Sequence, residues 1–253
     1  MKNAIVYAVN NNEKYLDMMA NSINSFYHFN PGLTSSVETV VLSQDNGLNL
    51  SKVKDGVPLK VVVMDNKNHP GFTQNKLTRF RNNCLTYRYE LFGKMFSDYD
   101  NVLYLDCDTE IGGTLDELFV ERESPVVNLI PGIDNPLSPR GVPKYGDLKC
   151  PTYYNSGVIL ATPRLIGETT CQKIYETLCE LTTKFPQLRW PDQDALNAVF
   201  GMDEFISLVK PLPKTYNFTW STRPKCTAKE ARAATEYKIK HYVGLKKYDF
   251  RFI

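Results

Sequence analysis

Two aspartates separated by one residue follow an apolar run near the middle of the chain. Asp106 and Asp108 flank Cys107 directly after the run 102–105. Carboxylates placed in a loop just past a buried strand can converge on one divalent cation. Such a cation bridges carboxylate and phosphate oxygens, and it stabilises the charge on a phosphate that departs as a leaving group. Acidic residues are also common in the turns that follow strands. The pair alone therefore indicates either a metal–phosphate site or an ordinary turn.

The elements around the pair predict an α/β fold. Short β-branched runs predict strands at 5–9, 37–42, 59–64 and 102–105. Apolar residues from Leu16 to Phe26 recur at helical spacing, and the motif Asn30-Pro31-Gly32 should end that helix. A second helix is expected over about 83–97. This βαβ order predicts a doubly wound, mainly parallel, Rossmann-like sheet, in which ligands bind beyond the carboxyl ends of the strands.

The second half of the chain continues the alternation. Strands are expected at 125–130, 157–162 and 205–209, and helices at 163–184 and from Pro191 onward. The Pro/Gly-rich stretch 131–151 is long for a loop in a compact domain, and such loops are often lids or binding segments.

Composition favours one domain over residues 1–253. The chain has 42% hydrophobic residues, which is enough for one sizeable core, and a net charge of +2 gives no strong nucleic-acid signal. The basic stretch 67–83 is only a modest candidate for a nucleic-acid-binding surface. There is no signal-peptide pattern and no apolar run long enough to span a membrane, so a cytoplasmic protein is expected. Unpaired cysteine spacings favour reduced, structural thiols. The cysteines are Cys84, Cys107, Cys150, Cys171, Cys179 and Cys226.

Four segments in order resemble glycosyltransferase family 8, the group of glycogenin and the bacterial lipooligosaccharide galactosyltransferases. They are 100–108 (DNVLYLDCD), 154–158 (YNSGV), 191–197 (PDQDALN) and 241–247 (HYVGLKK). The resemblance covers most of the chain. It implies a GT-A fold with a small antiparallel element, a retaining mechanism, and Mn²⁺ with a nucleotide-sugar donor such as UDP-glucose or UDP-galactose.

The family pattern implies that Asp106, Asp108 and His241 bind the metal, with Cys107 in the same cofactor site. Two carboxylates and one imidazole suit Mn²⁺ better than Mg²⁺, because Mg²⁺ prefers oxygen ligands throughout. Mg²⁺ is the second candidate. The resemblance further implies that Gly244 lets backbone approach the diphosphate and that Lys247 neutralises the leaving group. Without the motif, a lone histidine and a lysine pair are typical of ordinary structural or solvated positions.

The segment that opens with Pro191 would contact the donor sugar. The resemblance implies that Asp192 binds a sugar hydroxyl and that Gln193 lies close to the anomeric carbon, although an amide is a poor nucleophile. Asn155 and Ser156 would hydrogen-bond the sugar or diphosphate, and a strand-entry turn is their alternative. For Asp194, capping of the helix N-terminus is the competing interpretation.

The end of the first strand would bind the nucleotide base, through the backbone of Ala8 and Val9 and the side chain of Asn10. Here the sequence departs from the family, because Asn12 stands where an aromatic residue commonly stacks on uracil, with Tyr15 nearby. The identity of the base therefore stays open.

Arg88 resembles a basic residue near the donor phosphates, and a surface arginine on an amphipathic helix is its alternative.

Two other functions are alternatives to the transferase. A sugar-nucleotide nucleotidyltransferase normally carries a Gly-rich phosphate loop near its N-terminus, and Asn10-Asn11-Asn12 contains no glycine. A non-catalytic nucleotide-sugar-binding protein should have lost a metal ligand, and all three remain. The expected acceptor is a carbohydrate or glycoconjugate, which Tyr216, Phe218 or Trp220 could stack on unless they pack in the core.

Overall fold

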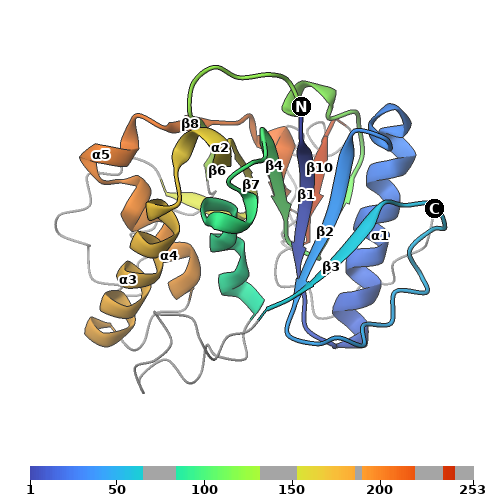
Figure 1. Ribbon diagram of the computed structural model, residues 1–253, viewed down its shortest axis with the longest axis horizontal. Helices are drawn as coiled ribbons and strands as arrows, with labels where there is room; N and C mark the ends of the chain where they lie inside the picture. The colour runs from blue at the N-terminus through green and yellow to red at the C-terminus, as the bar shows by residue number, and fades with distance from the viewer. Residues whose placement is uncertain (65–83, 132–152, 186–189, 220–235, 243–253) are drawn as a thin grey trace, which may run out of the picture.

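The computed structural model describes residues 1–64, 84–131, 153–185, 190–219 and 236–242 (Figure 1). A seven-stranded sheet has the order β3-β2-β1-β4-β7-β6-β8, and a three-stranded sheet has the order β5-β10-β9. The strands are β1 (Asn3–Ala8), β2 (Val37–Ser43), β3 (Leu59–Val63), β4 (Asn101–Leu105), β5 (Thr109–Ile111), β6 (Val127–Pro131), β7 (Tyr154–Ala161), β8 (Val209–Pro211), β9 (Phe218–Thr219) and β10 (Ile239–His241). The helices are α1 (Glu13–Phe29), α2 (Pro163–Ile166), α3 (Thr169–Lys184), α4 (Pro191–Phe200) and α5 (Asp203–Ile206).

The direction of the strands changes in the middle of the large sheet. β3, β2, β1 and β4 are all parallel, as the βαβ order predicts, whereas β7 is antiparallel to both of its neighbours. The amino end of β7 therefore lies beside the carboxyl end of β4, where Val158 pairs with Leu105. This reversal makes the sheet mainly parallel rather than fully parallel, and it brings the residues before Val158 next to those after Leu105.

Helix α1 contains the predicted apolar run and ends where the sequence predicts. The side chain of Asn12 accepts a hydrogen bond from the Lys14 amide and caps the N-terminus. At the other end Asn30 follows the last turn, and its Nδ2 donates to the Phe26 carbonyl. Pro31 cannot continue the α-helical hydrogen bonding and instead opens a short 3₁₀ turn.

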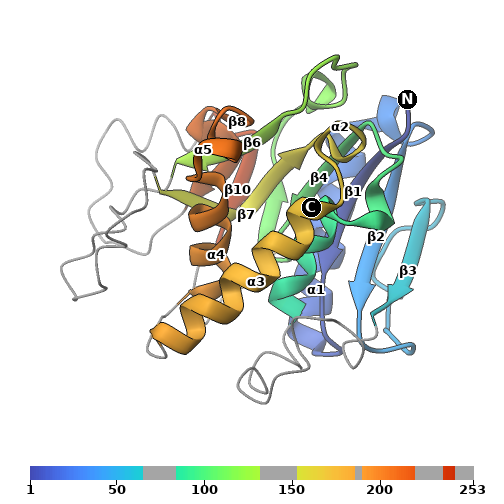
Figure 2. The same ribbon diagram turned by 60° about the vertical axis from the view of Figure 1, so that its left-hand side comes forward.

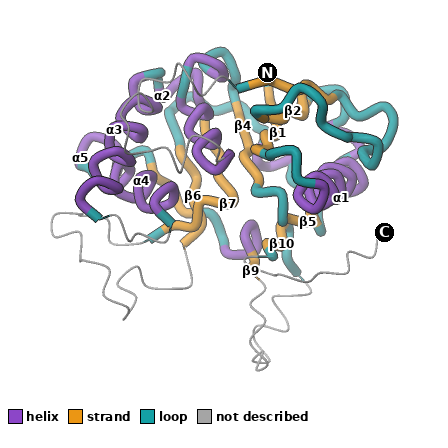
Figure 3. The backbone as a smooth tube through the Cα atoms, turned by 90° about the horizontal axis from the view of Figure 1, so that it is seen from below, coloured by secondary structure: helices purple, strands orange, loops and turns teal. Residues whose placement is uncertain are grey.

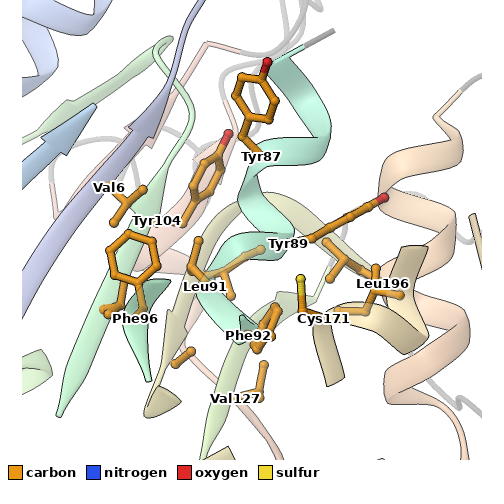
Figure 4. Close-up of a cluster of buried hydrophobic side chains, with 14 of the residues drawn as sticks. Val6, Tyr87, Tyr89, Leu91, Phe92, Phe96, Tyr104, Val127, Cys171 and Leu196 are labelled. Carbon is orange, nitrogen blue, oxygen red and sulfur yellow. The ribbon is translucent and has the colours of Figure 1, made fainter. Parts of the chain in front are cut away.

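Both faces of the central strands β1 and β4 are buried, which explains why these strands are continuous apolar runs, whereas the edge strands β3 and β8 are partly exposed. Alternate residues of β1 and β4 enter two separate cores. One core lies against α3, α4 and the 3₁₀ segment η3 (Cys84–Phe92), and the other lies against α1 and β5. Figure 2 shows α3 between α4 and η3. In Figure 4, Leu91 and Phe92 of η3 fill the first core while Tyr89 points toward α4.

The small sheet lies on the α1 side of the large one (Figure 3). β10 is antiparallel to β5, with His241 opposite Thr109, and it is parallel to the two-residue β9. The small element is therefore mixed rather than purely antiparallel. Strand β5 follows the Asp106–Asp108 turn directly. Its pairing with β10 therefore places His241 opposite the end of that turn.

Three sequence predictions were wrong in detail. The helix expected over 83–97 is described from residue 84 as two 3₁₀ segments, η3 and η4 (Lys94–Phe96), which are separated by Gly93. A Cβ at Gly93 would lie 3.0 Å from Glu90 Oε2 and 3.3 Å from Cys171 Sγ, so the chain passes close to α3 and these neighbours would have to shift to admit a side chain there. The helix expected over 163–184 is divided into α2 and α3, because Gly167 has φ 88°.

The strand expected over 205–209 is instead helix α5 followed by β8. Phe205 packs against the first core from that helix, so the start of the apolar run 205–209 belongs to a helical turn rather than to a strand. The stretch 131–151 is described only at Pro131.

Among the described residues, no helix is both long enough and apolar enough to cross a membrane. The four cysteines within the described ranges are all free thiols.

Candidate functional site

The turn between β4 and β5 presents the two aspartates at the carboxyl end of the central strands. The Asp106 amide donates to the Gly157 carbonyl at 2.8 Å, which extends the pairing of β4 with β7 by one residue. Asp106 Oδ1 accepts from Tyr104 Oη at 2.8 Å and from Arg88 Nη2 at 3.1 Å. One carboxylate oxygen of Asp106 is therefore occupied by the protein, and the other oxygen, Oδ2, faces His241.

His241 reaches the aspartates because β10 pairs with β5. Its Nε2 lies 3.1 Å from Asp108 Oδ1 and 3.6 Å from Asp106 Oδ2. One ligand atom from each of these three residues lies within 4.8 Å of the other two, and the imidazole is only 3% exposed. The Tyr242 amide also donates to the Asp108 carbonyl at 2.8 Å, which fixes the strand end against the turn. The structure thus brings together the three residues expected to bind metal.

The charges of this group stabilise one another. Burial lowers the pKa of His241, but the hydrogen bond with Asp108 and the charges of both aspartates outweigh burial, so the pKa is raised. Burial raises the pKa of Asp108, but the same hydrogen bond and the charge of the imidazolium lower it further, so its pKa is below the usual range. In the absence of a cation, a proton on His241 therefore balances the carboxylates.

The donor set fits a divalent cation of the Mn²⁺ type, which accepts both carboxylate oxygen and imidazole nitrogen. Gly157 supplies a second sign of a built site. A Cβ at this position would lie 2.1 Å from His241 Cε1 and 2.7 Å from Asp106 Oδ2. Only a residue without a side chain leaves room for these two ligands to face each other.

Arg88 is a buried part of this cluster, so the alternative reading as a surface arginine is wrong. Only 2% of the residue is exposed. Its Nη1 donates to Ser156 Oγ at 2.6 Å and to the Ser156 carbonyl at 2.7 Å. Its Nη2 lies 3.6 Å from Asp192 Oδ2 in addition to the contact with Asp106. Because these partners use most of its donors, Arg88 holds Ser156 and the two carboxylates in place.

The first turn of α4 brings Gln193 to the same cluster. Gln193 Oε1 accepts from the Ser156 amide at 3.0 Å and from Asn155 Nδ2 at 3.1 Å. The helix is fixed to β7 by Asn197, whose side-chain amide accepts from the Tyr154 amide at 2.7 Å and donates to the Tyr154 carbonyl at 2.8 Å. Asn155 and Ser156 therefore lie within strand β7 rather than in an entry turn.

The acidic residues of α4 do not cap it. No side chain caps this helix, and Tyr153 Oη donates to Asp194 Oδ1 at 2.7 Å. Asp192 is 9% exposed, and its pKa is raised because burial outweighs the nearby Arg88 guanidinium. A partly desolvated carboxylate beside the cluster is suited to accept a hydrogen bond from a ligand hydroxyl.

The end of β1 lies on the other side of the aspartates. The Cys107 thiol donates to the Ala8 carbonyl at 3.4 Å, so this buried cysteine ties β1 to the turn. Burial raises its pKa well above the usual value, and the thiol is neutral. The Val9 amide pairs with the Leu42 carbonyl and extends the sheet. Asn10 Oδ1 is buried with no partner among the described residues, which is unusual for an acceptor.

No contact with this cluster is seen for Tyr15 among the described residues. Tyr15 is 48% exposed on α1, and Asn12 serves as the cap of that helix. Gly244 and Lys247 lie outside the described residues.

Asn217, at the end of the 3₁₀ segment η6 (Lys214–Asn217), was missed as a site residue by the sequence analysis. It hydrogen-bonds both His241 and Asn155. Its position right after Tyr216, where the aromatic residues had drawn attention, was the only signal available.

Comparisons with known proteins agree with this architecture. The chain is 26% identical over 168 residues to the lipopolysaccharide 1,2-glucosyltransferase of Escherichia coli, a match that covers 64% of this chain. The match spans about half the length of that relative, 48%.

Among solved structures, the galactosyltransferase LgtC in complex with donor and acceptor sugar analogs has a TM-score of 0.63 at 18% identity, covering 96% of this chain and 88% of that chain. Mouse xyloside xylosyltransferase 1 has a TM-score of 0.60 at 15% identity, covering 96% and 98%. These neighbours establish the GT-A fold. The family model for glycosyl transferase family 8 matches residues 5–248, which is nearly the whole chain. The chain therefore belongs to glycosyl transferase family 8.

Proposed function

We propose that this protein is a metal-dependent, retaining glycosyltransferase that moves a hexose from a nucleotide diphosphate sugar to a carbohydrate or glycoconjugate acceptor. The observation that carries the proposal is the cluster in which a metal-binding group and the first turn of α4 are joined by hydrogen bonds. Asp106, Asp108 and His241 form that group. Mn²⁺ with a UDP-hexose such as UDP-glucose or UDP-galactose is the combination that fits the donor set and the family. Membership of the family favours this function over a nucleotidyltransferase or a scaffold.

The residues would divide the work as follows. A cation bound by Asp106, Asp108 and His241 supplies charge stabilisation for the departing diphosphate. Arg88 is buried and holds the carboxylates of Asp106 and Asp192 in their orientation. Asp192 would accept a hydrogen bond from a hydroxyl of the donor sugar. Gly244 and Lys247 are proposed to complete the diphosphate site. Asn10, with its unpaired acceptor, is proposed to receive an N–H of the base.

Gln193 is unsuited to act as a covalent nucleophile in this arrangement. Its carbonyl oxygen already accepts from a backbone N–H and from Asn155, and an amide oxygen that accepts hydrogen bonds is an even weaker nucleophile than a free one. We therefore propose that the acceptor attacks C1 from the same face of the sugar that the diphosphate leaves, so that the configuration at C1 is retained. The bond from C1 to the diphosphate breaks with its electron pair going to the phosphate, the acceptor oxygen bonds to C1, and the acceptor proton passes to the leaving phosphate oxygen.

The decisive assay is release of nucleoside diphosphate from UDP-, GDP- and ADP-sugars in the presence of Mn²⁺, Mg²⁺ or EDTA. Wild type should release the diphosphate from one donor with Mn²⁺, and Asp108→Asn should release none because it loses a charged ligand. Asp116→Asn, an exposed aspartate in another turn, is the matched control and should behave as wild type. If wild type neither releases diphosphate nor binds any of these donors in calorimetry with Mn²⁺, the proposed function is wrong.

A further inference from the structure

The Asn217 side chain joins His241 of the metal-binding group to Asn155 of β7 by two hydrogen bonds of its own. It is 4% exposed. Its Oδ1 lies 2.9 Å from His241 Nδ1, and its Nδ2 donates to Asn155 Oδ1 at 2.7 Å. Asn155 in turn donates to Gln193 Oε1. A continuous path therefore leads from the imidazole to the first turn of α4.

The direction of every bond in this path is fixed by two backbone amides. A backbone N–H can only donate. The Gly157 amide lies 2.9 Å from one atom of the Asn155 side chain, so that atom is the oxygen. The Ser156 amide lies 3.0 Å from one atom of the Gln193 side chain, so that atom is also the oxygen. Neither side-chain amide can be turned over without setting two groups of the same kind against each other.

The same logic assigns the proton on His241. Because Asn155 presents its oxygen, the atom of Asn217 that faces it must be the NH₂ group. The oxygen of Asn217 then faces His241 Nδ1, which must carry a proton to make the contact at 2.9 Å. With Nδ1 holding this proton, the proton that a cation displaces is the one on Nε2, so the lone pair forms on the nitrogen that points toward Asp106 and Asp108. A hydrogen bond of this kind to the distal nitrogen is how proteins orient a metal-binding imidazole.

We propose that Asn217 is a positioning residue with two separable roles. Its oxygen holds His241 in the tautomer that can bind a cation, and its NH₂ group holds Asn155, which orients Gln193. The carbonyl oxygen of Gln193 is engaged, and no described residue accepts a hydrogen bond from its NH₂ group, so this group is what Gln193 offers to the sugar. The inference rests on the proposed function for the identity of the ligands, whereas the roles in tautomer and cation binding stand apart from it.

Two variants separate the roles. Asn217→Asp keeps an oxygen for the His241 N–H but cannot donate to Asn155, where two oxygens would now face each other. Asn217→Ala removes both contacts. The matched control is Asn128→Ala, which removes a buried amide of β6 that donates to the Lys210 carbonyl, beside the carboxyl end of β7 and away from Asn155.

Three readouts are taken on each protein. The dissociation constant of Mn²⁺ alone is measured from the paramagnetic resonance signal of the free ion. The tautomer of His241 is measured from its ring ¹⁵N shifts in histidine-labelled protein with diamagnetic Zn²⁺, which is practical because the chain has only three histidines. The turnover number for diphosphate release is measured at saturating Mn²⁺.

Asn217→Ala should raise the Mn²⁺ dissociation constant about 10–100-fold, the usual effect of losing such a partner, and should shift the His241 ring signals. Asn217→Asp should bind Mn²⁺ as tightly as wild type, with the Nδ1 proton retained, while its turnover number falls about 10–100-fold. Asn128→Ala should lose stability without changing either property of the cation site.

Unchanged Mn²⁺ affinity and ring signals in Asn217→Ala would overturn the first role, and wild-type turnover in Asn217→Asp would overturn the second. If the alanine variant does not fold, loss of the Nδ1 proton in the aspartate variant, which is nearly the same size as wild type, would overturn the first role. Absence of transfer by wild type with every donor would refute the proposed function, and the Mn²⁺ and ¹⁵N comparisons would still decide the role of Asn217 at His241.

Discussion

Replacement of Gly157 by alanine should remove cation binding without unfolding the protein. The new Cβ would lie 2.1 Å from His241 Cε1, whereas ordinary contacts begin near 3.4 Å. The imidazole and the strand must therefore separate by about 1.3 Å, while metal–ligand distances tolerate only about 0.2 Å. His241 is 3% exposed and is held by β10, so it cannot withdraw into solvent. Overpacking of this kind costs about 1–3 kcal/mol of stability, which a domain of this size survives.

Two measurements test this reasoning. The Mn²⁺ dissociation constant of Gly157→Ala should rise at least as much as the roughly 100-fold that loss of an outer partner of a ligand can cost. In thermal unfolding, wild type should gain about 2.7 kcal/mol from Mn²⁺ at 100 times its dissociation constant, and the variant should gain no more than about 0.4 kcal/mol at the same concentration. Gly47→Ala is the control, because a Cβ there meets nothing within 4 Å. Wild-type Mn²⁺ affinity in Gly157→Ala would refute the assignment of His241 and Asp106 as paired ligands.

Four further outcomes are expected. Mn²⁺ must displace the proton that Asp108 stabilises on His241, so calorimetry across pH should show affinity falling about tenfold per unit below the raised pKa of His241. The same raised pKa stabilises the metal-free fold fully below the unfolded value near 6.5, and urea titrations should show this contribution lost as pH rises through the folded pKa. Arg88→Met leaves buried carboxylates unpaired and should cost about 3–5 kcal/mol in urea unfolding, whereas Arg164→Met, which breaks a half-exposed ion pair with Asp100, should cost under about 1 kcal/mol. Asn30→Ala removes the acceptor of the Leu115 amide and should cost about 1–3 kcal/mol by the same assay.

The central strands and helix α1 could be predicted because local pattern and burial agree there. β1 and β4 are apolar on both faces, and α1 has a cap, an apolar stripe and a proline just past its end. The segment η3 could not be predicted in this way. It forms a 3₁₀ segment that ends at Phe92, and Gly93 directly after it lies close to Cys171 of α3.

The candidate site divides along the same line. Asp106 and Asp108 could be singled out from residue type and spacing, and His241 only through resemblance to a family. Asn217 and Asn197 act through partners on β7 that are distant in sequence. No local pattern marks a buried asparagine whose importance comes from two bonds across the fold. For Arg88 the sequence left two alternatives open, a place near the donor phosphates and a surface position, and only tertiary packing shows its burial.

The small sheet has a consequence for how the protein is made. Strands β1 to β4 and β7 can pair as soon as residues up to 161 have left the ribosome, whereas β10 and the imidazole it carries are synthesised some eighty residues later. During translation the chain therefore passes through a stage in which the main sheet can exist without its cation ligand. A nascent or prematurely terminated chain that stops before residue 236 would lack His241, so the third cation ligand is acquired only after the strands of the main sheet have been synthesised.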